Sequence, residues 1–362
     1  MATSAAAALS FPTPRALPSP LQPRRRRRAE PPACTHSERG VTFDPGSAFY
    51  RSDSAAGRDL AVLAATLHRR AADTPAPFLC LDAMCGCGVR ALRYLAQVGA
   101  DFVWANDASE ALRPVIVGNL SRFERAPDRR WAVSHLDATR LLSERYLRRE
   151  YFDVIDVDSF GGDAAYIRAA LLALRIGGLL YLTSTDWRSA RGYGSRSNYG
   201  FICHCKSCGQ SRTFGFHELG QITCDCADKI VGTRVSVVDP DSITVVGPLW
   251  TGPLHDTTFL TKMLSLATEW GWANTIENGI SLEKLLDTMI EESDSRLPPG
   301  YIRLDEIASR AKVNSPPLGT LINSLRKEGY AACRSHIGAN AIKTNCPIEC
   351  CLEVAQEIRN LR

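Results

Sequence analysis

Short apolar runs alternate with helical patterns through the first half of the chain. Apolar residues at helical spacing follow these runs, as at Val89, Leu92 and Leu95. Five of the runs have the length and composition of buried parallel strands, and they cover residues 78–81, 102–105, 131–136, 152–157 and 179–183. This succession of strand and helix predicts an α/β fold built on a doubly wound, Rossmann-like parallel sheet.

A glycine-rich loop, DAMCGCG at residues 82–88, joins the first predicted strand to its helix. Gly86 and Gly88 allow a tight turn and the close approach of a ligand, and the helix start offers free N–H groups. The same glycines fit a loose dinucleotide fingerprint. Asp82 favours S-adenosylmethionine over a dinucleotide, because a carboxylate repels a pyrophosphate but can hold a sulfonium cation. A turn that binds no ligand is the structural alternative.

Three further acidic residues follow predicted strands. Asp107 lies 19 residues beyond Gly88, where an acid in such repeats takes the ribose hydroxyls, although it could instead cap a helix. Asp137 could bond an adenine amino group or cap the helix after it. Asp158 could accept a proton from an exocyclic amine while Phe160 stacks on the base, or the segment could be a simple turn.

The second half of the chain is rich in cysteine. Of 13 cysteines, five fall between residues 203 and 226. Cys205, Cys208, Cys224 and Cys226 form two short pairs, which predicts a closed tetrahedral structural Zn²⁺ site of the zinc-ribbon kind. Free structural thiols or a redox pair are the alternatives.

Helical patterns return after the cysteines. They cover residues 257–268, 281–291, 304–311 and 318–328, and residues 329–343 follow as a possible β-wing. A winged-helix-like tail of this kind would contact RNA backbone through Arg334, His336 and Lys343. A helical packing domain without RNA contact is the alternative.

Charge and composition add a leader segment. The formal net charge is +4, but the first 30 residues hold six arginines and one glutamate, so the remainder is close to neutral. Global charge therefore gives no signal for nucleic acid. The leader is typical of transit peptides and predicts chloroplast or mitochondrion, with a nuclear signal at residues 24–28 as the alternative. No apolar run reaches membrane-spanning length, so we expect no membrane partner.

Several of these segments together resemble the tRNA (guanine(26)-N(2))-dimethyltransferase family of S-adenosylmethionine enzymes. The likeness covers most of residues 40–362 and rests on DAMCGCGVRALRY, WAND, LDATRLL, FDVIDVDSFG and GPLWTGPLHD. It implies tRNA as the substrate and Asp158 as the catalytic carboxylate. The residues that it implies for cofactor contact are Arg58, Arg90, Asp107, Asp137 and Ala138. We expect a monomer.

The sequence departs from this family in two places. Ser159 replaces a proline that usually follows the catalytic acid. Relatives also carry several dozen more residues after the fifth strand, where residues 187–198 here lead directly to the cysteines. A catalytically impaired splice isoform that at most binds RNA is therefore an alternative function, and a dinucleotide-dependent oxidoreductase is a third.

The sequence predicts four segments. Residues 1–36 form a transit peptide or disordered leader, and residues 37–190 form the cofactor-binding methyltransferase domain, which lacks its last strands. Residues 191–256 hold the junction and the zinc-binding segment. Residues 257–362 form a C-terminal α+β domain that binds RNA.

Overall fold

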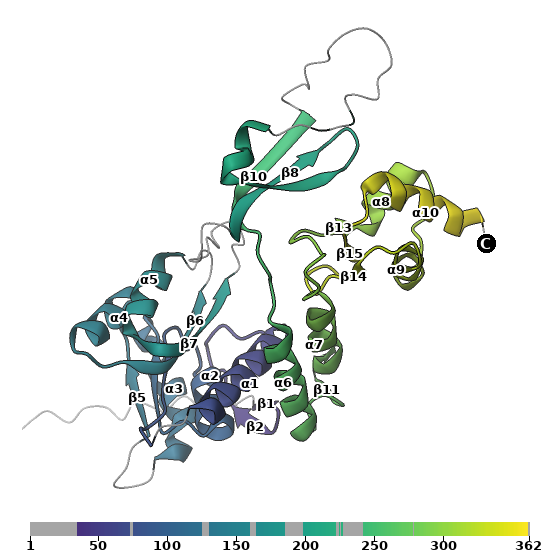
Figure 1. Ribbon diagram of the computed structural model, residues 1–362. Helices are drawn as coiled ribbons and strands as arrows, with labels where there is room; N and C mark the ends of the chain where they lie inside the picture. The colour runs from purple at the N-terminus through teal and green to yellow at the C-terminus, as the bar shows by residue number, and fades with distance from the viewer. Residues whose placement is uncertain are drawn as a thin grey trace, which may run out of the picture. The chain divides into compact units, whose positions relative to one another are not determined.

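The computed structural model of the chain (Figure 1) describes residues 35–72, 75–124, 130–159, 164–184, 198–221, 224, 226, 242–277 and 279–360. The described residues belong to one compact unit, and residues 1–33 lie outside the described part of the chain. None of the helices in the described part is long and apolar enough to cross a bilayer.

A five-stranded parallel sheet forms the first half of the molecule, as the apolar runs predict. Its order is β5-β4-β3-β6-β7. The strands are β3 (Leu79–Asp82), β4 (Phe102–Asn106), β5 (Trp131–Ser134), β6 (Phe152–Ser159) and β7 (Leu174–Ser184). The order reverses beside β3, so the carboxyl ends of β3, β4 and β6 meet where open α/β sheets bind their ligands.

Helices cover both faces of this sheet (Figure 1). One face packs against α1 (Ala55–Ala71), α2 (Val89–Arg93) and α3 (Arg113–Leu120). The other packs against α4 (Ala138–Leu147) and α5 (Ala164–Ala173). The predicted strand at residues 179–183 begins earlier in the structure, so that Gly177 and Gly178 lie within β7. Gly177 has a φ of +78° there, a conformation that glycine adopts without strain.

A small hairpin before the sheet is not foreseen in the sequence analysis. It pairs β1 (His36–Glu38) with β2 (Val41–Phe43) in antiparallel register. The side chain of Phe43 is buried in the core that α1 and α2 share. The hairpin therefore belongs to the folded domain and carries Glu38 into its interior.

Two helices from the second half complete the same core. They are α6 (Thr257–Glu269) and α7 (Leu282–Glu291), and the short strands β11 (Ile276–Glu277) and β12 (Ile280–Ser281) lie between them. Leu260 and Leu266 of α6 and Leu286 of α7 are buried with residues of α1 and the sheet. These helices therefore share the hydrophobic core of the first domain, although the sequence analysis groups them with the C-terminal domain.

The cysteine-rich segment is a small antiparallel sheet. Its order is β10-β8-β9, and its strands are β8 (Tyr199–Cys205), β9 (Ser211–Gly215) and β10 (Ile243–Trp250).

Residues 302–360 form a second core of their own. A three-stranded antiparallel sheet has the order β13-β15-β14. The elements are β13 (Ile302–Arg303), α8 (Leu304–Ala311), α9 (Leu318–Lys327), β14 (Ala332–Arg334), β15 (Ala341–Thr344) and α10 (Ile348–Asn360). The expected helix pair and β-hairpin are both present, and α10 adds a helix that the sequence analysis does not predict.

Candidate functional site

A cavity of about 500 Å³ lies at the carboxyl ends of β3, β4 and β6. That volume is in the range of small-molecule sites, which is about 300–1,000 Å³. The predicted site residues on its wall are Arg58, Gly86, Arg90, Asp107, Asp137, Ala138 and Asp158. The fold thus brings together residues that are 100 positions apart in the sequence.

The glycine loop turns under the cavity in the way that its residues predict. Gly86 and Gly88 have φ values of +55° and +82°, which other residues adopt only with strain. Asp107 accepts a hydrogen bond from the Gly86 N–H at 3.0 Å through Oδ2 and another from the Ser109 N–H at 2.9 Å through Oδ1. Asp107 therefore holds the loop to the end of β4 and borders the cavity at the same time.

Asp82 does not take the place that the sequence analysis gives it. Its side chain is fully buried, does not line the cavity, and accepts a hydrogen bond from the Ala91 N–H at 3.1 Å. Burial, followed by the charge of Asp156, raises the pKa of Asp82 well above its usual value. This position corrects the expectation that Asp82 holds a cofactor cation directly. Its buried carboxyl group instead anchors the start of α2 to the end of β3.

Arg90 of α2 links the carboxylates on β6. Its Nη1 lies 3.3 Å from Asp156 Oδ2, and its Nη2 lies 3.1 Å from Asp158 Oδ2. Burial raises the pKa of Asp156, although Arg90 and the hydroxyl of Tyr94 counteract part of this increase. Burial would lower the pKa of Arg90, but the surrounding Asp156, Tyr181, Tyr94 and Asp158 together outweigh it, so that the pKa rises well above its usual value. Arg90 therefore remains a guanidinium cation on the cavity wall.

Asp137 and Ala138 begin α4 beside the cavity. Asp137 Oδ1 accepts a hydrogen bond from the Arg140 N–H at 3.0 Å, so Asp137 is the N-cap of that helix. The sequence analysis leaves capping and adenine binding open, and the cap is present. Asp137 is exposed and also lines the cavity, which is compatible with ligand contact as well.

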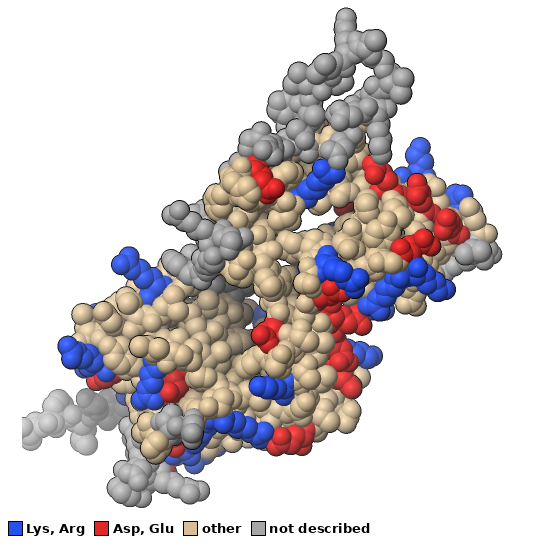
Figure 2. All heavy atoms as spheres, in the orientation of Figure 1, with Lys and Arg blue, Asp and Glu red and all other residues tan. Residues whose placement is uncertain are grey.

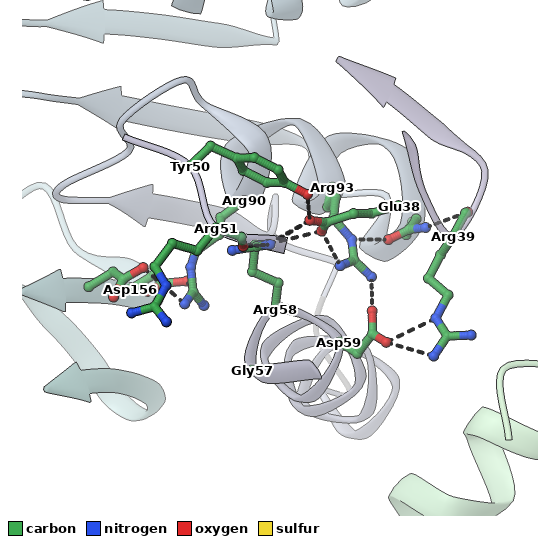
Figure 3. Close-up of polar contacts among 12 residues, drawn as sticks. Glu38, Arg39, Tyr50, Arg51, Gly57, Arg58, Asp59, Arg90, Arg93 and Asp156 are labelled. Atoms are coloured by element: carbon green, nitrogen blue, oxygen red, sulfur yellow. Dashed lines mark hydrogen bonds and ion pairs between the residues drawn. The ribbon is translucent and has the colours of Figure 1, made fainter. Parts of the chain in front are cut away.

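Arg58 is held by residues that the sequence analysis does not single out. Its guanidinium binds both oxygens of Glu38 and lies 5.1 Å from the ring centroid of Tyr50 (Figure 3). Glu38 also accepts hydrogen bonds from Arg93 Nη1 at 3.0 Å and from the Tyr50 hydroxyl at 2.8 Å. The sequence signal for the hairpin that holds Glu38 is weak, because its strands have three residues each and Gly40 is the main indication of the turn between them.

The aromatic residue predicted for base stacking, Phe160, lies outside the described residues. Three other aromatic residues line the cavity, namely Phe49, Tyr50 and Tyr166. The side chain of Phe49 is largely exposed, so it offers an apolar ring at the cavity mouth. A planar base could stack there.

Two groups of side chains have the composition of metal sites. Cys205, Cys208, Cys224 and Cys226 place their sulfur atoms close together, with Sγ–Sγ distances of 3.6 Å for 205–226, 3.4 Å for 208–224 and 3.2 Å for 224–226. Four thiolates at Zn–S bonds of about 2.3 Å would be separated by about 3.8 Å, so the set fits Zn²⁺.

The second group is His255, Glu292 and His336. Glu292 Oε2 accepts hydrogen bonds from His255 Nε2 at 2.9 Å and His336 Nδ1 at 2.5 Å, and the buried Lys343 Nζ lies 3.7 Å from it. An ammonium ion beside the carboxylate repels a metal cation, so the group is better suited to an ion-pair cluster. Lys343 is buried in this cluster, which corrects the expectation that it contacts RNA; His336 is partly exposed and Arg334 is exposed, so their predicted RNA contacts remain predictions.

Comparison with known proteins adds a family to this geometry. The family model for N2,N2-dimethylguanosine tRNA methyltransferase matches residues 33–196 and 188–356. The two matched stretches meet at residues 188–196, where the sequence analysis finds its departure.

Relatives and one solved structure agree with this match. The tRNA (guanine(26)-N(2))-dimethyltransferases of Thermococcus kodakarensis and Pyrococcus horikoshii are each 25% identical to the chain; the alignments cover 86% of the chain and 93% and 92% of those proteins. The structure of Trm1 from Pyrococcus horikoshii with S-adenosyl-L-methionine has the same fold, with a TM-score of 0.65 and 20% identity over 88% of this chain and 99% of that one.

Proposed function

Because this chain belongs to the N2,N2-dimethylguanosine tRNA methyltransferase family, we propose that it methylates the exocyclic N2 of guanine 26 in tRNA with S-adenosylmethionine as donor. The observation that carries the proposal is the cavity in which the glycine loop and Asp158 meet. The match continues on both sides of the junction, so the alternative of a catalytically impaired isoform is not favoured. A dinucleotide oxidoreductase is not favoured either.

The cavity residues fit this cofactor. The bend at Gly86 and Gly88 admits a ligand close to the backbone, and Asp107 and Asp137 border the space where adenosine hydroxyl and amino groups need acceptors. Arg58, Arg90 and Ala138 complete the same wall. S-adenosylmethionine bound there supplies the methyl group.

Asp158 is placed to take up the proton of the reaction. Its side chain is 37% exposed, and Oδ2 is bound by Arg90. Among the described residues, the structure gives Oδ1 no hydrogen-bond partner, so that oxygen can accept a proton from the guanine amino group as its new N–C bond forms. Guanine must leave the stacked tRNA to reach Asp158.

Transfer of labelled methyl groups to tRNA tests this function. Wild-type protein should methylate tRNA with guanine at position 26 but leave tRNA with adenine there unlabelled. Asp158→Asn should lower kcat by about 100-fold or more, because a positioned proton acceptor contributes about that factor. The exposed Asp287, in α7, provides the control, and Asp287→Asn should retain the wild-type rate. Full activity of Asp158→Asn would remove the proposed role.

We propose further that residues 302–360 act as a winged-helix module on tRNA. The order β13-β15-β14, with α8 and α9 inserted after β13, supports this assignment. On the face drawn in Figure 2, Lys and Arg are interspersed with Asp and Glu, so we expect tRNA contact to depend on local cations such as Arg334. Arg334→Ala should weaken tRNA binding and reduce its salt dependence by about one phosphate contact.

A structural Zn²⁺ in the Cys205, Cys208, Cys224 and Cys226 set is also part of the proposal, supported by the short sulfur separations. We propose that residues 1–36 direct the chain to a chloroplast or mitochondrion, with the nucleus as the alternative. A fluorescent protein fused behind residues 1–36 should enter an organelle, and nuclear fluorescence would support the alternative. We expect a monomer, which light scattering of the purified protein would test.

A further inference from the structure

We propose that Arg90, besides lining the wall that would hold the cofactor, is a positioning residue that fixes the Asp158 carboxylate for proton acceptance. This inference rests on the proposed methyltransferase function and adds to it. Arg90 is enclosed between the ends of β6 and β7, where it contacts both Asp158 and Thr183.

The guanidinium of Arg90 is held from several sides. Nη1 binds Asp156, and Nη2 lies 3.1 Å from Asp158 Oδ2 and 3.3 Å from Thr183 Oγ1. Its central carbon lies 5.3 Å from the ring centroid of Tyr181. Tyr181 is itself anchored, because its hydroxyl donates a hydrogen bond to the Gly57 carbonyl at 2.6 Å. Arg90 therefore has a defined orientation on the cavity wall.

The partners of Arg90 differ greatly in exposure. The Arg90 side chain is 5% exposed and Asp156 is fully buried, whereas Asp158 is 37% exposed. The guanidinium thus ties a carboxylate at the cavity surface to one in the interior of the sheet. Asp158 and Thr183 are paired neighbours on β6 and β7, so both anchors of Nη2 belong to the same sheet edge.

This arrangement separates the two oxygens of Asp158. Oδ2 accepts from Arg90, while Oδ1 has no partner among the described residues. Rotation of the carboxylate would break the contact with a guanidinium that is fixed elsewhere. A planar guanidinium can bridge two carboxylates in this way, but the ammonium of lysine is a single point donor on a flexible chain. Charge alone is therefore not sufficient for the role.

The test compares Arg90→Lys with Arg93→Lys. Arg93 lies one turn further along α2 and is also buried among carboxylates, but it contacts Glu38 and Asp59 rather than Asp158 (Figure 3). Loss of stability should therefore occur in both variants. Arg90→Lys should lower kcat by about 10-fold or more, while the KM and the calorimetric Kd for S-adenosylmethionine stay within about 3-fold of wild type. Arg93→Lys should leave kcat near the wild-type value.

A double mutant separates positioning from an independent effect. Arg90→Lys combined with Asp158→Asn should be no slower than Asp158→Asn alone, because Arg90 acts through that carboxylate. Additive losses would overturn the inference, as would a weakened Kd with unchanged kcat, which would make Arg90 a cofactor-binding residue. If wild-type protein is active and Arg90→Lys has the same kcat, the positioning role of Arg90 is refuted but the proposed function is not. A wild-type protein without any methyl transfer refutes the proposed function and this inference with it.

Discussion

Replacement of Glu38 by alanine is expected to destabilise the protein strongly. The Glu38 carboxylate is buried and accepts hydrogen bonds from Arg58, Arg93 and Tyr50. Glu38→Ala leaves the buried Arg58 without its carboxylate partner, whereas Arg93 retains Asp59 at 2.6 Å. Removal of one partner from a buried ion pair costs about 3–5 kcal/mol, so we expect a loss of that size in the free energy of unfolding.

Urea denaturation followed by circular dichroism measures this loss. The exposed pair of Arg303 and Asp305 provides a control, since surface ion pairs contribute little, and Asp305→Ala should leave the unfolding curve unchanged. A Glu38→Ala curve that coincides with wild type would refute the reasoning, because it would mean that the buried guanidinium of Arg58 finds another partner or water.

The stabilisation by Glu38 should decrease at low pH. Burial alone would raise the pKa of Glu38, but the hydrogen bonds and charges of Arg58 and Arg93 outweigh it and lower the pKa below 4.5. A carboxyl group whose pKa is lower in the folded state stabilises the protein above its unfolded pKa. The difference between wild type and Glu38→Ala should therefore be constant above about pH 5 and shrink as the pH falls below 4.5.

Three other predictions follow from separate sites. Cys208→Ser should lower bound zinc from about one equivalent per chain to well below that, measured by metal analysis of the purified protein. Glu292→Gln should reduce the free energy of unfolding by about 3–5 kcal/mol, because Lys343 loses its buried counter-charge. Hydrogen bonds from His255 and His336 outweigh burial and lower the pKa of Glu292, so its carboxylate is still charged at pH 5. Urea denaturation at pH 5 should therefore show the same loss of stability. Asp137→Ala should cost about 1 kcal/mol of stability through the lost N-cap, and a larger rise in the Kd for S-adenosylmethionine would indicate direct cofactor contact.

The parallel strands and the helices between them can be predicted from the sequence for a physical reason. Buried parallel strands have nearly continuous apolar runs, so β3, β4 and β6 are visible without any knowledge of tertiary contacts. The carboxyl ends of parallel strands lie at one edge of the sheet, so the polar residues that follow them could be predicted to lie close together. Asp107, Asp137 and Asp158 do meet there, at the cavity.

The errors have a different origin. The role of Asp82 depends on its depth, and a sequence shows that an acid follows a strand but not whether the next helix covers it. Glu38 lies in a three-residue strand, which is too short for a periodic signal. Lys343 has the sequence context of a surface cation, but in the structure it is buried beside Glu292, which directly follows α7. In each case a partner distant in the sequence determines the environment.

The β1–β2 hairpin sets a limit on how far the N-terminus can be trimmed. If a processing protease removes the leader, a cut before His36 leaves the hairpin whole, whereas a cut after Glu38 discards the counter-ion of Arg58 together with a strand of the hairpin. Any mature protein produced by such a cleavage should therefore begin at or before His36.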